Sequence, residues 1–138
     1  MANIVDTQNI EEGHRNAVVK ITAVLDTVDL NIVSIIKLEN FRNNDPTARL
    51  TGFRFDHCNY SMGQQLDALL SWNGAVPQPI VPLARSGKID VSDDGGLLPD
   101  TTRTGYDGSI NLKTSGFVPG SVQNLTLIIR LVKLYAVR

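Results

Sequence analysis

The sequence predicts a single, mainly β domain: an antiparallel β-sandwich or a jelly-roll or barrel-like fold, with an extended N-terminal arm. Three observations lead to this prediction. Short apolar segments follow the period-2 pattern of strands, turn-forming Gly, Pro, Asn and Asp separate them, and no segment makes a convincing long helix. The 138 residues have room for one domain and not comfortably for two. We therefore expect an arm over residues 1–16 and one domain over residues 17–138.

The composition narrows the classes of partner. With 42% hydrophobic and 20% charged residues, the chain can bury a sizeable core. The net charge of −1 gives no global positive field for nucleic acid, and no apolar run approaches the length that spans a membrane. The single cysteine, Cys58, excludes an intramolecular disulfide and a thiolate zinc cluster. The first residues lack the pattern of a signal peptide, so we expect folding in a cytoplasm.

The N-terminal part predicts an arm followed by two strands. The arm is polar, with Ile4, Val5 and Ile10 as isolated apolar positions, and is expected either to fray in solution or to become ordered against a partner. Residues 17–25 are β-branched and alternate, and residues 30–38 alternate again after a short polar turn. The apolar face of the second segment carries Leu30, Ile32, Ile36 and Leu38. Two such segments predict a β-hairpin.

The middle of the chain predicts a loop, two strands and an edge segment. Residues 39–48 carry turn-forming Asn, Asp and Pro, and residues 50–57 form a strand with Phe53 and Phe55 on the same side. The spacing over residues 62–72 fits both a helix and a strand, and its length and position between strands favour a strand. The following segment is expected to run along a sheet edge, because prolines cannot donate to a central ladder; these are Pro77, Pro79 and Pro82.

The last third predicts two short strands and one long strand. Residues 88–91 and 109–113 are the short strands, separated by a long connection. Residues 125–137 are apolar on both faces, with Leu125, Leu127, Ile129 and Leu131 on one and Ile128, Val132, Leu134 and Ala136 on the other. Such a strand is either central in the sandwich or exposed on one side to a partner subunit, and both interpretations stay open.

No combination of residues predicts a catalytic centre. Nucleophilic catalysis needs a nucleophile, a base and an orienting group held close together. The histidines that could serve as the base are His14, which lies in the expected arm, and His57. His57 neighbours Cys58, but adjacent strand residues point to opposite faces, so a core cysteine beside a polar-face histidine is expected. The sequence does not distinguish any two carboxylates as the pair that glycoside hydrolysis requires, and it contains no glycine-rich motif of the kind that binds nucleotide phosphates. We expect no enzyme activity, no cofactor and no small-molecule substrate.

Two charged clusters and six apolar positions complete the candidates. A divalent ion would best fit the carboxylates of Asp90, Asp93, Asp94 and Asp100, but they lack EF-hand spacing, so a solvated turn without metal is expected. A solvated strand face, rather than a phosphate-binding stripe, is expected for Arg130, Lys133 and Arg138. The positions best suited to contact a partner are Ile4, Val5, Ile10, Ile128, Val132 and Leu134.

About half of the chain, from Leu66 onward, resembles small β-rich proteins encoded among the virion genes of tailed bacteriophages. The motifs that carry the resemblance are Leu66-x-Ala68-x-Leu70-x-Trp72, Ser86-Gly87-Lys88-Ile89-Asp90, Gly95-Gly96-Leu97, Gly108-Ser109-Ile110-x-Leu112-x-Thr114-x-Gly116 and a closing Leu-Ile-Ile-Arg-Leu-Val-Lys strand. These motifs are packing and turn elements.

The resemblance implies a virion component made in the host cytoplasm, and within that class a capsid decoration or cement protein. Its expected partners are the major capsid protein and further copies of itself, as a homodimer or homotrimer. Two alternatives stay open. One is a neck, tail or fibre-base component of the virion. The other is a carbohydrate-binding β-sandwich module that uses Trp72, Tyr106 and the loop over residues 93–105, although Trp72 is itself expected in the core or an interface.

Overall fold

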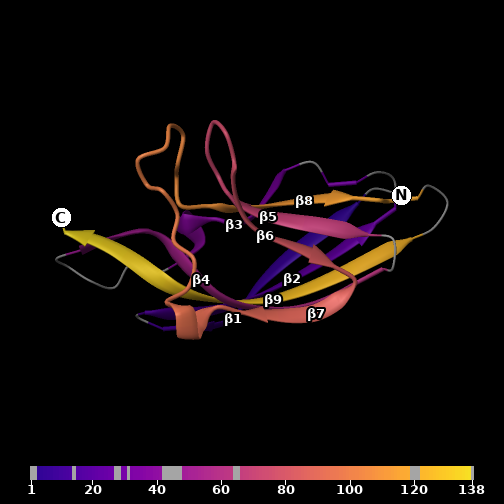
Figure 1. Ribbon diagram of the computed structural model, residues 1–138, viewed down its shortest axis with the longest axis horizontal. Helices are drawn as coiled ribbons and strands as arrows, with labels where there is room; N and C mark the ends of the chain where they lie inside the picture. Colours follow the sequence, from indigo (N-terminus) through magenta and orange to yellow (C-terminus); the bar gives the residue numbers. More distant parts are fainter. Residues whose placement is uncertain are drawn as a thin grey trace.

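Two antiparallel sheets face each other across a common core (Figure 1). The computed structural model describes residues 3–13, 15–26, 29–30, 32–41, 48–63, 66–118 and 122–137, the last two by their backbone alone. The order across the five-stranded sheet, sheet A, is β1 (Ile4–Glu12), β2 (Asn16–Leu25), β9 (Gln123–Val137), β4 (Ala48–Met62) and β7 (Ser86–Asp90). The order across the four-stranded sheet, sheet B, is β3 (Val33–Ile36), β8 (Ile110–Ser115), β5 (Asp67–Trp72) and β6 (Gln78–Ala84). Two short 3-10 helices, η1 (Leu38–Asn40) and η2 (Ser92–Asp94), lie in the connections.

The strand order is that of a jelly roll. Each of β2 to β5 pairs with the strand that mirrors it in the second half of the chain: β9, β8, β7 and β6 in turn. The chain is thus a long antiparallel ribbon, and rolling it up brings β9 beside β4 and β8 beside β5. The predicted fold class is confirmed, and β1 is an additional strand at the edge of sheet A. Within the described residues, no helix has the length and hydropathy to cross a membrane.

The predicted hairpin between residues 17–25 and 30–38 is wrong, because the two strands lie in different sheets. Strand β2 pairs with β1 and β9, whereas β3 pairs with β8. Strand β3 has only four residues, and its register shifts at Ile35, so that Ile35 and Ile36 are both buried. Ile32, expected on the buried face, is 44% exposed and has a φ of 52°. Alternation identified the strands but not their partners, because partners in a jelly roll are distant in sequence.

The segment expected to be a free arm forms strand β1, which pairs with β2 from Ile4 to Glu12. Its sequence lacks an apolar stripe because, of its hydrophobic side chains, only Val5 packs against the core. Backbone pairing therefore carries most of its attachment. The Thr7 hydroxyl adds a 3.0 Å hydrogen bond to the carbonyl of Ile35, which ties β1 to the edge of sheet B.

A buried ion pair holds the C-terminal end of β1. The Nζ of Lys133, in β9, lies 2.9 Å from Oε2 of Glu12, and the two side chains are 0% and 13% exposed. Lys133 was expected on a solvated strand face with Arg130 and Arg138, and that prediction is wrong for Lys133. Odd-numbered residues of β9 face the interior, so Lys133 and Arg130 point to opposite sides of sheet A. Arg138 lies outside the described residues.

Side chains from both sheets fill the interior. Phe53 and Phe55 share the buried side of β4, as expected, and the rings of Phe53 and Phe41 meet edge to face with centroids 4.7 Å apart. The ambiguous segment forms strand β5 over residues 67–72, and Trp72 is in the core at 2% exposure. Strand β6 carries Pro79 and Pro82 along the edge of sheet B, also as expected.

Candidate functional site

Four of the six predicted contact positions lie on the outer face of sheet A, namely Ile4 in β1 and Ile128, Val132 and Leu134 in β9. Strand β9 occupies the centre of this sheet, between β2 and β4. Its even-numbered residues point outward, where Ile128, Val132 and Leu134 are only partly covered. Strand β9 is therefore central in sheet A with one face in the core, and its accessible face carries these three aliphatic side chains, the aliphatic stripe, on either side of Arg130. Contact of this face with a partner subunit stays a prediction.

The predicted positions in β1 divide between the two sides of the strand. Ile4 is paired with outward-facing Val24 and is 56% exposed, and Ile10, at a β-bulge, is 51% exposed. Val5 instead is partly buried and packs against the core, on the opposite side of β1 from Ile4. Because only β2 separates β1 from β9, the exposed part of β1 and the aliphatic stripe belong to one sheet.

A row of polar side chains crosses this face from edge to edge. The register places Glu11, Val18, Arg130, His57 and Asp90 side by side on successive strands. Neighbouring strands are about 4.8 Å apart, so Arg130 lies one strand from His57 and two strands from Glu11. Arg130 and Glu11 make no hydrogen bond or ion pair within the described residues. These charges line a depression of about 570 Å³ together with Ile128 and Val18.

The sequence alone did not bring this row together, because its members come from five strands. Outward alternation in β9 points to Arg130, and Asp90 ends a strand that alternation also identifies. Placing Glu11 and His57 beside them requires the register. That register includes a shift between Phe55 and His57, which no local pattern specifies.

His57 has a carboxylate neighbour but no nucleophile. Its Nδ1 is buried without a hydrogen-bond partner, and no described hydroxyl or thiol is hydrogen-bonded to the ring. Asp90 lies opposite His57, but its Oδ1 accepts hydrogen bonds from the Ser92 hydroxyl at 2.6 Å and the Ser92 amide at 3.0 Å. These hydrogen bonds lower the pKa of Asp90, with a smaller contribution from the nearby His57. The row thus presents the charged side chains of Glu11, Arg130 and Asp90 at the surface of sheet A.

Cys58 points into the core, on the opposite face from His57, as expected. Burial raises the pKa of its thiol to about 12, because the thiolate loses solvation. The folded protein should therefore resist thiol reagents at pH 8 and react fully once unfolded, which a colorimetric thiol assay with and without denaturant measures. Rapid labelling of the folded protein would contradict this placement.

The same pKa shift makes folding stability depend on pH. The unfolded chain loses the thiol proton near pH 9, the ordinary value, whereas the folded chain keeps it to about pH 12. Above pH 9 the folded state thus binds more protons, so this group should lower the free energy of unfolding as pH rises.

The four aspartates considered for a divalent ion do not form one site. Asp93 and Asp94 lie exposed in η2, and Asp90 is engaged with Ser92. Across residues 3–137, where described, no group of three or more His, Cys, Asp or Glu is placed to hold a metal ion.

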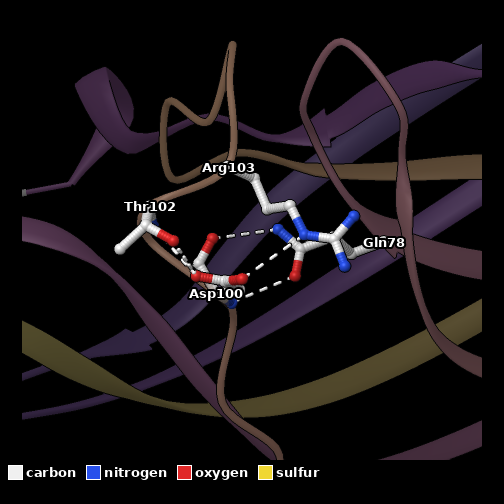
Figure 2. A network of polar contacts seen from close by, with 4 residues as sticks. All are labelled: Gln78, Asp100, Thr102 and Arg103. Carbon is white, nitrogen blue, oxygen red and sulfur yellow. Dashed lines mark hydrogen bonds and ion pairs between the residues drawn. The ribbon is translucent and has the colours of Figure 1, made fainter.

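Asp100 belongs to a separate network that fastens the long connection to β6 (Figure 2). Its Oδ1 accepts from the Thr102 hydroxyl at 2.6 Å, and its Oδ2 pairs with Arg103 at 3.3 Å. Its backbone amide and carbonyl both bond the side chain of Gln78, at 3.0 Å each. The hydrogen bond from Thr102 is the main cause that lowers the pKa of Asp100. These contacts hold a loop in place and leave the carboxylate occupied.

The aromatic side chains proposed for sugar binding are not displayed. Trp72 is buried, and Tyr106 is partly buried with its hydroxyl donating to the carbonyl of Thr51 at 3.1 Å. The large hydrophobic side chains that are exposed in the described residues are all aliphatic. Trp72 and Tyr106 therefore do not form an exposed ring on which a sugar could stack.

Comparisons with known proteins find similar folds only. No family model and no curated protein matches the chain. Among solved structures, a cupin superfamily protein from Desulfitobacterium hafniense DCB-2 is 9% identical over 97% of this chain and 81% of its own, with a TM-score of 0.37. A structure described as CBM4 is 10% identical over 96% of this chain and 95% of its own, with a TM-score of 0.33. The assignment of a β-sandwich rests on the sheet topology of the chain itself, and these comparisons identify no relative in sequence.

Proposed function

We propose that this protein is a non-enzymatic structural subunit that attaches to a larger protein assembly through the outer face of sheet A. The assembly that we propose is the capsid of a tailed bacteriophage, where the chain would serve as a decoration protein on the major capsid protein. The observation that carries the proposal is the outward row of β9, in which the aliphatic Ile128, Val132 and Leu134 lie on either side of Arg130. Among the described residues, Arg130 and Glu11, two strands away, make no ion pair.

The physical basis is the combination of apolar area and oriented charge. Interfaces between proteins have an apolar centre and a polar rim, and buried apolar area contributes roughly 25 cal/mol per Å² before the costs of association. Ile128, Val132 and Leu134 provide such a centre. Arg130 provides a charge that a carboxylate of the partner can pair with, and Arg is among the residues that most often dominate binding energy.

The capsid part of the proposal rests on the resemblance of residues 66–133 to phage virion proteins. The motifs behind it fall on β5, β7, β8, β9 and the turn after η2. The turn glycines, Gly95 and Gly96, have φ values of 89° and 74°, which non-glycine residues rarely adopt. The shared motifs thus describe how the sandwich is built, and the attachment surface has to be tested separately.

Substituting the centre of the stripe tests the attachment surface. Val132→Asp should weaken binding to capsids of the encoding phage that lack this protein by roughly a hundredfold, because it places an unpaired charge in the apolar centre. The matched control is Leu98→Asp, at a residue that is 63% exposed and lies outside sheet A, which should bind as the wild type does. Binding is measured by co-sedimentation with the capsids, after thermal unfolding confirms that both variants fold. Equal binding of the wild type and Val132→Asp would rule out this face.

A further inference from the structure

The loop between β5 and β6 contains the only Asn-Gly pair in the sequence, Asn73-Gly74. In such a pair the backbone nitrogen of the glycine can reach the side-chain carbonyl carbon of the asparagine, because glycine has no Cβ to hinder the approach. Attack closes a cyclic imide and releases ammonia, and hydrolysis of the imide leaves aspartate or isoaspartate. The reaction is favoured because both reacting groups are held in one chain.

The attacking nitrogen of Gly74 lies between two amides that are hydrogen-bonded. The amide of Asn73 donates to the carbonyl of Ser109, and the amide of Ala75 donates to the carbonyl of Thr104, both at 2.9 Å. The amide of Gly74 makes no hydrogen bond to any described residue. Asn73 and Gly74 are both partly accessible, so water can reach the pair. No hydrogen bond within the described part of the chain has to break before this nitrogen attacks.

The side-chain carbonyl of Asn73, which the nitrogen would attack, accepts a hydrogen bond from a buried donor. The Nδ2 of Asn111 donates to Oδ1 of Asn73 at 2.9 Å. Asn111 is 1% exposed, and its own Oδ1 accepts from the Ser34 hydroxyl at 2.9 Å, which keeps its Nδ2 directed at Asn73. Negative charge develops on Oδ1 of Asn73 as the nitrogen attacks, and a fixed donor at that atom stabilises the transition state.

We propose that Asn73 is a self-modification site of the folded protein, at which the Gly74 nitrogen displaces ammonia while Asn111 stabilises the developing oxyanion. In the first step the Gly74 nitrogen loses its proton to solvent, the N–Cγ bond forms and the Cγ–Nδ2 bond breaks, and the leaving group takes a proton from water to become ammonia. In the second step a water molecule adds to the imide and cleaves one of its two C–N bonds. Water is the co-reactant, and no atom is oxidised or reduced.

The product places a second carboxylate beside Asp107. Burial raises the pKa of Asp107, but hydrogen bonds from the Ser109 amide and from the side chains of Asn73 and Ser109 lower it overall, so Asp107 is charged at neutral pH. Deamidation replaces the Asn73 donor by a like charge, where the β5–β6 loop meets the connection that precedes β8. The modification should therefore loosen this junction irreversibly. It involves loops of sheet B, so the inference does not rest on the proposed attachment through sheet A.

Peptide mass spectrometry of the full chain, kept folded at pH 8 over several days, tests the proposal. The peptide that contains Asn73 should gain about 1 Da and separate into aspartate and isoaspartate forms of equal mass. Asn59 and Asn124 are exposed but precede Tyr60 and Leu125, so they should stay unmodified in the same digest and serve as internal controls. Absence of the mass gain at Asn73 would overturn the proposal.

Two variants and one change of condition test the assigned roles. Gly74→Ala should slow the reaction about tenfold or more, because a Cβ hinders the nitrogen. Asn111→Ala should slow it about tenfold, because the oxyanion loses its donor. Incubation of the wild type in urea, which separates Asn111 from Asn73 without any substitution, should slow it too. A reaction that is faster in Asn111→Ala or in urea would mean that the fold restrains Asn73, and would contradict the proposal.

The consequence for the fold is tested with the product itself. Asn73→Asp should lower the midpoint of thermal unfolding by about 3 °C or more, because its carboxylate faces that of Asp107. Asn124→Asp makes the same chemical change at an exposed position and should unfold as the wild type does. Equal midpoints for Asn73→Asp and Asn124→Asp would contradict the loosening of the junction.

Discussion

Replacing Glu12 with alanine should lower the free energy of unfolding by about 3–5 kcal/mol, a large fraction of the stability of a small domain. The reason is the position of its partner. The Lys133 ammonium is 2.9 Å from the Glu12 carboxylate, and the Lys133 side chain is 0% exposed. Removing the carboxylate takes away a charge that compensates the burial of the ammonium. Urea denaturation, monitored by the fluorescence of Trp72, measures the change.

Two further variants make this result interpretable. Glu11→Ala removes the neighbouring carboxylate, which is exposed, and should change stability by no more than about 0.5 kcal/mol. The double variant Glu12→Leu/Lys133→Met replaces the pair by apolar side chains and should recover most of the loss, since such replacements of buried pairs are often neutral. Equal effects of Glu12→Ala and Glu11→Ala would contradict the buried ion pair.

The same pair changes the expected result of truncation. Deleting a free arm leaves a fold intact, but deleting residues 1–12 removes Glu12 and the hydrogen bond from Thr7 to Ile35. It also uncovers the edge of β2. A truncated protein should therefore be destabilised and prone to aggregate, and point substitutions are the better way to test the role of β1.

Phe53→Ala should be destabilising by about 3–5 kcal/mol, because it leaves a cavity between the two sheets. Phe53 is fully buried in β4 and loses its edge-to-face contact with Phe41. Val76→Ala, at a 69% exposed position, is the control and should stay within about 0.5 kcal/mol. Chemical denaturation measures both. A loss below about 1 kcal/mol in Phe53→Ala would mean that Phe53 does not fill the core.

Strand identity was predictable where burial imposes alternation. The strands β4 and β9 have buried faces with a period of two and were predicted from that pattern. The spacing of β5 also fitted a helix, and its length and position between strands decided the prediction. Strand β1 was not predicted, because its residues are mostly exposed and backbone pairing leaves no mark in hydrophobicity. The pairing of β2 with β9 was not predictable either, since it joins residues more than a hundred positions apart, such as Ala17 and Leu131.

The candidate site was predictable to the same extent. Ile128, Val132 and Leu134 followed from the two apolar faces of one strand. The charges beside them did not, because Glu11, Arg130 and Asp90 meet only through the register of the sheet. Lys133 shows the opposite failure: its charge indicated a solvated position, but its place in the alternation of β9 puts it inside.

The central claim, that the chain is a repeated structural subunit on a phage capsid, is tested most directly by its copy number. Quantitative mass spectrometry of purified virions of the encoding phage measures this protein relative to the major capsid protein. The proposed role predicts a copy number comparable to that of the major capsid protein. A number of copies sufficient only for one ring would place the chain in the neck, tail or fibre base, and its absence from the virion would contradict the structural role.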